Sequence, residues 1–173
     1  MAKLSIVQRK WWLSVHIVFA ALWTGTVLSM FLLSWRNTSS ENGEVLSALN
    51  AAINLLDDFV VIPAAIGSVI TATVLCWGTN YGFTKFYWVI SKWLLSSSLI
   101  IFGTFWLFPW GNYAEKAATE TGIAALQDTT YGFDARGVLY GTLAQVVFLL
   151  IIIGISVLKP WGRKATAQRS SES

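Results

Sequence analysis

The chain has 173 residues, of which 55% are hydrophobic and 12% charged, with a mean hydropathy of +0.58. A soluble protein of this size cannot hide so much apolar surface in one core, so the composition excludes an ordinary soluble domain and indicates a membrane protein in contact with the lipid bilayer. The formal net charge is +3. The basic residues are placed as topology determinants, so we expect no nucleic-acid partner. A single cysteine, Cys76, excludes an internal disulfide and a multi-cysteine metal site.

Four apolar runs predict four transmembrane helices. In chain order they are Trp11–Trp35, Phe59–Trp77, Trp88–Trp110 and Val138–Leu158. Each approaches or exceeds the roughly 20 residues that a helix needs to cross the hydrocarbon core. The first run is too long for a cleaved signal peptide, so we expect a retained signal anchor. The predicted fold is all-α: one domain over residues 1–173, an integral membrane four-helix bundle with up-down topology and a disordered tail over residues 164–173.

The distribution of charge predicts the orientation of these helices. Nine of the twelve Lys and Arg residues belong to the two chain ends or to the second connection: Lys3, Arg9, Lys10, Lys85, Lys92, Lys159, Arg163, Lys164 and Arg169. Eight of the nine acidic residues lie in or beside the first and third connections: Glu41, Glu44, Asp57, Asp58, Glu115, Glu120, Asp128 and Asp134. Because cationic segments stay on the cytoplasmic side, we expect both termini to be cytoplasmic, in a bacterial cytoplasmic (inner) membrane.

The connections also carry helical patterns. Leucine and isoleucine recur at helical spacing over Glu44–Asp58, which predicts either an interfacial helix or an extension of the second span. A short helix is expected over Tyr113–Thr121. Pro63 is expected in the first turn of the second span, where its missing amide donor has little effect.

Small residues and polar residues predict which helix faces pack together. Ala21 and Gly25 lie four residues apart on the first span and are expected to face a neighbouring helix. On the third span, the periodicity places five residues on one interior face: Lys92, Ser96, Leu99, Gly103 and Trp106.

His16 is the only histidine of the chain. It follows Trp12, which we place at the membrane interface, by four residues, so a helical rise puts it about 6 Å inside the bilayer. Ala20, Trp23 and Thr24 share its helix face. An ionisable residue within a span usually faces the bundle interior and is a functional candidate. The alternative is a neutral histidine that is hydrogen-bonded to a neighbouring hydroxyl or carbonyl.

Lys92 follows another tryptophan, Trp88, by four residues. The first and third spans run in the same direction, so Lys92 and His16 are expected at nearly the same depth. One alternative is that the lysine bends back to the interface, as long cationic side chains do near helix ends. Against it, a cation near a helix N-terminus opposes the helix dipole, and an anionic partner would remove that cost.

The two residues together predict a ligand of a particular charge. No acidic residue lies in the half of any span that holds His16 and Lys92. If both face the interior, their partner is an anionic ligand such as a porphyrin propionate, a lipid phosphate or a quinol-type anion. The candidate cofactor-binding residues are His16, Trp23, Thr24, Lys92 and Ser96. His16 is also the candidate axial ligand of a haem iron, and the cofactors considered are haem b and porphyrin.

Three short motifs carry a resemblance to known proteins. They are His16-x6-Trp23-x-Gly25, Pro63-x3-Gly67 and Trp88-x3-Lys92. Over the first 110 or so residues the chain resembles a group of small bacterial integral membrane proteins of unknown function, and it is distantly similar to the CopD and HemJ-type four-helix proteins.

HemJ-type proteins are haem-binding protoporphyrinogen oxidases with a histidine in the first span and a lysine in the third. The resemblance assigns these two positions to His16 and Lys92. This chain lacks that family's Pro-Arg and second histidine at the end of the first span, and its Met-Arg region before the second. The family's second axial ligand is therefore without a counterpart, and the oxidase activity does not follow from the resemblance.

Two functional hypotheses of different classes remain. In the first, the bundle binds a haem, a porphyrin or another anionic cofactor at His16 and Lys92 and carries out redox chemistry. In the second, it is a non-enzymatic membrane scaffold, accessory subunit or small transport component, which associates with a partner protein or a second copy of itself. A visible absorption band that depends on His16 distinguishes the first hypothesis from the second.

Overall fold

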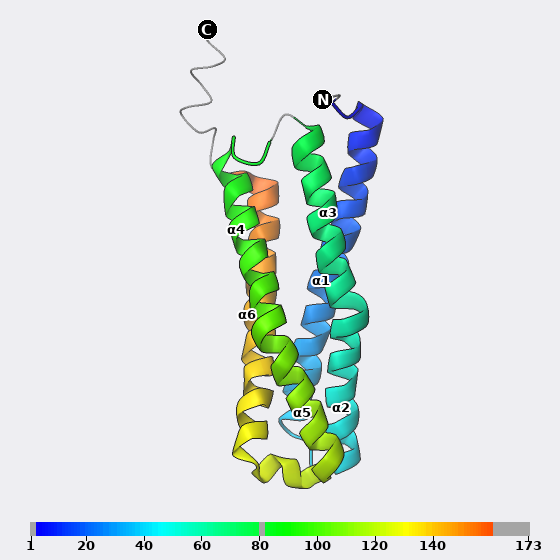
Figure 1. The fold of residues 1–173 in the computed structure, drawn as a ribbon, viewed down its shortest axis with the longest axis vertical. Coiled ribbons are helices and arrows are strands. Elements are labelled where there is room, and N and C mark those ends of the chain that lie inside the picture. Colours follow the sequence, from blue (N-terminus) through cyan, green and yellow to red (C-terminus); the bar gives the residue numbers. More distant parts are fainter. Residues whose placement is uncertain (1–2, 80–81, 161–173) are drawn as a thin grey trace.

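The computed structural model describes residues 3–79 and 82–160, and its elements are helices (Figure 1). In chain order they are α1 (Ile6–Asn37), α2 (Gly43–Leu56), the π-helical turn η1 (Asp57–Val61), α3 (Ile62–Gly78), α4 (Tyr87–Phe102), a second π-helical turn η2 (Gly103–Leu107), α5 (Phe108–Thr121), the 3₁₀ segment η3 (Gly122–Gln127) and α6 (Thr129–Leu158). The tail predicted to be disordered, residues 164–173, lies outside the described residues.

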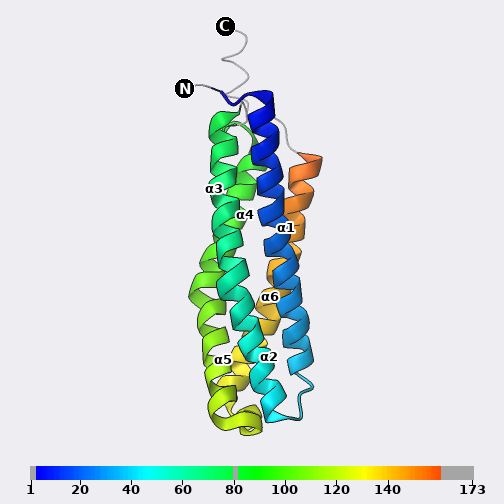
Figure 2. The same cartoon turned by 90° about the vertical axis from the view of Figure 1, so that its right-hand side faces the viewer.

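These elements form four long helical rods that lie side by side (Figure 1, Figure 2). The rods are α1, Gly43–Gly78, Tyr87–Gln127 and α6, and each is long and apolar enough to cross a membrane. The four expected apolar helices are therefore present. The second and third rods are longer than expected, because α2 continues into α3 and α4 continues into α5. The segment Glu44–Asp58 is thus an extension of the second rod, not a separate interfacial helix.

Local side chains explain where the rods begin. Ser5 accepts a hydrogen bond from the Gln8 amide at 3.2 Å, and the Gln8 side chain accepts one from the Ser5 amide at 2.9 Å. This capping box satisfies two amides that would otherwise lack partners at the start of α1. Asn42 and Asp128 cap the first turns of α2 and α6 in the same way, through their side-chain oxygens.

Both π-helical turns precede a proline. Pro63 follows η1 and Pro109 follows η2, each by two residues. Pro63 lies in the first turn of α3, as expected, but η1 joins this turn to α2 without a break. Proline has no amide donor and its ring crowds the preceding turn. A π turn, with its wider i→i+5 bonding, accommodates that crowding without ending the helix.

The π turn η2 also changes which residues face inward. A π turn adds one residue to the helix, so the face beyond it is rotated. Leu99 is buried and Lys92 is partly buried, as expected, but Trp106 is 47% exposed and its neighbour Leu107 is 8% exposed. Trp106 was predicted to share the interior face with Leu99 and Lys92. This prediction is wrong because the extra residue of η2 interrupts the regular helical period.

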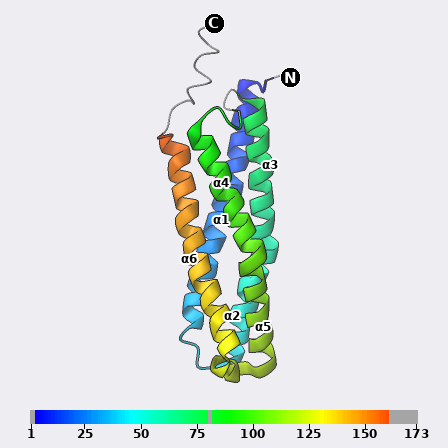
Figure 3. The same cartoon turned by 60° about the vertical axis from the view of Figure 1, so that its left-hand side comes forward.

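Two halves follow one another along the long axis of the molecule (Figure 1, Figure 3). The α2–α5 half contains α2, α5 and η3, with the end of α1 and the start of α6. The α3–α4 half contains α3 and α4, with the start of α1 and the end of α6. In this second half α3 packs on α1 and α4 packs on α6, whereas α3 and α4 make no extensive contact with each other over the described residues.

Close packing of α1 on α3 does not use the small residues that the sequence indicated. Ala21 and Gly25 are exposed, and a Cβ added to Gly25 would meet no atom within 4 Å. The prediction that they face a neighbouring helix is therefore wrong. The close approach occurs at Gly67 of α3, where an added Cβ would lie 2.5 Å from the ring of Phe19. The small residue that admits the neighbour belongs to α3.

Candidate functional site

His16 connects two helices of the α3–α4 half. It lies on α1, is partly buried, and its Nδ1 lies 2.9 Å from Oγ1 of Thr71 on α3. The imidazole is thus held on its Nδ1 side by α3, and a hydroxyl is its nearest polar neighbour.

Thr71 is itself anchored. Its side chain is only 2% exposed, and its Oγ1 donates to the carbonyl oxygen of Gly67 at 2.7 Å, with the Ser68 carbonyl oxygen at 3.0 Å. Threonine often bonds in this way to the preceding helical turn. Because Gly67 admits the Phe19 ring, α1 and α3 lie close enough for His16 to reach this hydroxyl.

Lys92 also lies in the α3–α4 half. It is partly buried on α4, within electrostatic range of His16 and of Cys76 on α3. Lys92 forms no ion pair with a carboxylate of the described residues. An ammonium and an imidazole therefore share this region without a carboxylate beside them.

The lysine also contacts the tryptophan one turn before it. Its Nζ lies 6.0 Å from the centroid of the Trp88 ring, and Nζ of Lys159 lies 5.7 Å from the same ring. Both contacts are cation–π interactions. The contact with Trp88 agrees with the expected lean of a lysine toward the start of its helix. The two lysines together make this end of the half cationic.

The other predicted site residues are Trp23, Thr24 and Ser96. Trp23 is 3% exposed, and its Nε1 has no hydrogen-bond partner among the described residues. It belongs to the central core, about 10 Å along α1 from His16. Thr24 donates its hydroxyl proton to the Ala20 carbonyl oxygen at 2.8 Å, so that proton is committed to its own helix. Ser96 is partly buried, one turn beyond Lys92 on α4.

The α3–α4 half offers a metal centre one imidazole, that of His16. Within the described residues there is no group of three or more His, Cys, Asp or Glu side chains that could hold a metal. A haem supplies four nitrogen ligands itself and needs one axial ligand from the protein, which an imidazole nitrogen can provide. His16 can therefore serve as a single axial ligand, and Thr71 holds its ring in the manner of a hydrogen-bonded metal-ligating histidine.

Sequence reasoning missed two residues of this site. Thr71 lies four residues beyond the motif Pro63-x3-Gly67, on the same face of the helix. A hydroxyl at this position in an apolar helix could have indicated a hydrogen-bond partner for His16. Lys159 was interpreted as a topology determinant. It takes a left-handed conformation, φ 46°, where α6 ends, and no sequence pattern indicates that its side chain returns to Trp88.

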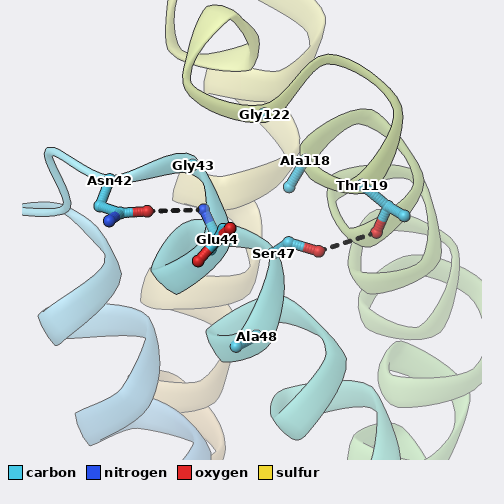
Figure 4. A pocket seen from close by; sticks show the side chains of 8 residues that line it. All are labelled: Asn42, Gly43, Glu44, Ser47, Ala48, Ala118, Thr119 and Gly122. Atoms are coloured by element: carbon cyan, nitrogen blue, oxygen red, sulfur yellow. Dashed lines mark hydrogen bonds between the residues drawn. The ribbon is translucent and has the colours of Figure 1, made fainter.

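A hollow lies in the α2–α5 half, between the start of α2 and the end of α5 (Figure 4). Eight residues line it: Asn42, Gly43, Glu44, Ser47, Ala48, Ala118, Thr119 and Gly122. Asn42 Oδ1 accepts from the Glu44 amide at 2.8 Å, and the Ser47 and Thr119 hydroxyl oxygens lie 3.0 Å apart. The Asn42 side chain thus caps α2, and the Ser47 and Thr119 hydroxyls bond to each other. We therefore assign this hollow a structural role.

In the α3–α4 half, His16 and Thr71 link α1 to α3, and Trp88 links α4 to the end of α6. No protein-family model, curated protein or solved structure matches this chain.

Proposed function

We propose that this chain is a multi-pass protein of the bacterial cytoplasmic membrane that binds an amphipathic anionic ligand in its α3–α4 half, between His16 and Lys92. Its four helices cross the bilayer in up-down order, with both termini in the cytoplasm. The Lys and Arg residues of the chain ends and of the connection between α3 and α4 support this orientation.

One observation carries the binding proposal. His16 and Lys92 lie within electrostatic range of each other in an apolar region, and no described carboxylate neutralises them. A partly buried cation without an anionic partner is costly, and ionisable groups within a membrane usually mark a ligand or ion pathway. An anionic group on a bound ligand would remove this cost.

A haem or porphyrin has the chemistry that these residues would hold. Lys92 would pair with a propionate, and His16 would ligate the iron through the ring nitrogen that Thr71 does not hold. A bound haem would supply one-electron redox chemistry. The residues of the chain bind it, orient it and exclude water, and the apolar side chains of α3 and α4 provide the dry surroundings.

The absorption spectrum of the full chain, purified in mild detergent, tests the binding proposal. We expect a Soret band, either as isolated or after addition of haemin, which is lost in His16→Ala. The matched control is Ser14→Ala, because Ser14 is exposed and lies two residues away on the same helix. A colourless chain that takes up no haemin contradicts the proposal and favours the non-enzymatic scaffold.

The lysine is tested by titration with haemin. Lys92→Ala is expected to weaken uptake by about tenfold, since removing a charged hydrogen-bond partner is worth about 1.5–3 kcal/mol. Lys85→Ala is the control, because Lys85 is exposed in the connection between α3 and α4. Equal weakening by both variants would show that only general positive charge matters.

The orientation has its own experiment. In a Cys76→Ser background, single cysteines replace Lys85 and Glu120, which lie near opposite ends of the third rod. A membrane-impermeant thiol reagent added to intact spheroplasts is expected to label position 120 and not position 85. The reverse pattern contradicts the proposed orientation without affecting the binding proposal.

A further inference from the structure

We propose that Thr71 is a positioning residue, which holds neutral His16 with its proton on Nδ1 and so leaves Nε2 as the unprotonated nitrogen of the ring. The further claim that Nε2 binds a ligand rests on the proposed function. The assignment of the proton rests on the hydrogen bonds between α1 and α3 alone.

The first step concerns the proton of Thr71. A threonine hydroxyl has one proton to donate and two lone pairs that can accept. The oxygen lies 2.7 Å from the Gly67 carbonyl oxygen, the usual length of an O–H···O hydrogen bond. The carbonyl of Ser68, at 3.0 Å, competes for the same proton. Both carbonyls can only accept, so the hydroxyl proton is committed to its own helix.

The second step concerns the imidazole. With its proton committed, Thr71 presents a lone pair to Nδ1 of His16, 2.9 Å away. Two acceptors do not attract each other, so Nδ1 must be the donor of this bond. In the opposite tautomer, with the proton on Nε2, Nδ1 and the Thr71 oxygen would face each other with a lone pair on each and no proton between them.

The third step concerns what the ring can then bind. In a neutral imidazole the nitrogen opposite a protonated Nδ1 carries a lone pair in the ring plane. Such a nitrogen attracts an electron-pair acceptor, such as a metal centre, and repels an anionic oxygen. The anionic group of the ligand therefore belongs at Lys92, and a metal centre belongs at His16. This separates the roles of the two residues and deepens the proposed ligand to one that carries both groups.

The single histidine makes the proton directly observable. Selective ¹⁵N labelling of histidine gives two ring-nitrogen signals that both belong to His16. At pH 8 the wild-type chain is expected to show a protonated Nδ1 and an unprotonated Nε2. A wild-type spectrum with the proton on Nε2, or with both nitrogens protonated, overturns the proposal.

Substitutions at one helical turn provide the variants and controls. Thr71→Val keeps the shape of the side chain but removes the hydroxyl, and is expected to shift the population toward the Nε2–H tautomer. Thr71→Ser is expected to keep the wild-type tautomer. Thr73→Val is the matched control, because the Thr73 hydroxyl donates only to the Val69 carbonyl oxygen at 2.8 Å and does not reach the histidine. An unchanged tautomer in Thr71→Val contradicts the role of Thr71.

Haemin titration of the same variants separates this inference from the proposed function. We expect Thr71→Val to bind haemin about tenfold more weakly, the usual effect of losing the partner that orients a metal-ligating histidine. Metal-free protoporphyrin, which gives Nε2 no iron, is expected to bind wild type and variant alike. A wild-type chain with the proton on Nδ1 that takes up no haemin contradicts the proposed function and still supports the role of Thr71. A Thr71→Val chain with the shifted proton and wild-type haemin affinity overturns its part in ligand binding.

Discussion

The two halves of the molecule differ in the polar groups that they hold. In the α2–α5 half the amides of Asn37 and Asn50 donate to the Tyr131 hydroxyl at 3.2 Å and 3.3 Å, and the acidic residue Asp134 is only 5% exposed. In the α3–α4 half the ionisable groups are His16 and Lys92, and neither forms an ion pair with a described carboxylate. The first half thus combines a network of neutral partners with a buried acid, whereas the second holds two groups that are cationic when protonated.

Packing follows the same division. Around Leu46, which is fully buried, small residues let α2 and α5 approach closely: Ala114 and Ala118 are at most 1% exposed. Most of the side chains over Thr71–Cys76 at the far end of α3 are, in contrast, only partly buried. The α2–α5 half is therefore more closely packed around Leu46 than α3 is over Thr71–Cys76, and stability measurements test this difference.

The largest expected effect is that of a cavity in the α2–α5 half. Leu46→Ala is expected to lower the free energy of unfolding by about 2–5 kcal/mol, the range for removing a buried leucine side chain. Leu75→Ala makes the same chemical change at a partly buried position of α3 and should have a smaller effect. Thermal unfolding of the purified chains in detergent measures both, and equal losses would show that the halves are equally tightly packed.

The next effect concerns the contact between the start of α2 and the end of α5. A Cβ added to Gly43 would lie 2.7 Å from the backbone nitrogen of Ile123 and 3.1 Å from Cα of Gly122. Because backbone cannot move aside cheaply, Gly43→Ala is expected to destabilise the chain by about 1–3 kcal/mol.

The matched control for this substitution is Gly25→Ala. No atom lies within 4 Å of the new Cβ, so this change is expected to be neutral or to stabilise α1 by up to about 1 kcal/mol through helix propensity. Thermal unfolding of the Gly43→Ala and Gly25→Ala chains measures both effects. A destabilised Gly25→Ala chain would reveal that this exposed face of α1 is covered by another protein.

The smallest expected effect is in the polar network. Tyr131→Phe removes the hydroxyl that accepts from Asn37 and Asn50, but Asn50 also donates to the Leu46 carbonyl oxygen at 2.9 Å. Only the Asn37 amide loses its acceptor, so the expected cost is about 1 kcal/mol. Tyr140→Phe, at a residue that is 64% exposed, should have no effect. Similar stabilities of the two variants would mean that the network contributes nothing to the α2–α5 half.

The number of apolar helices and their approximate positions follow from composition and helical spacing, which are local properties of the chain. The extension of the second rod through Glu44–Asp58 was one of two predicted alternatives. The continuation of α4 into α5 was missed, because a proline normally ends a helix and the π turn before Pro109 offsets that tendency.

Tertiary structure alone decided which side chains meet. Thr71 reaches His16 because Gly67 admits Phe19, and Gly25 stays exposed because α1 is rotated away from its neighbours there. Trp106 faces outward because η2 shifts the helical register. Each of these outcomes depends on how one helix is rotated against another, a quantity that involves residues far apart in the chain and that helical periodicity does not contain. The common depth of His16 and Lys92 stays a prediction, while the contact of His16 with the Thr71 hydroxyl depends on the packing of α1 on α3.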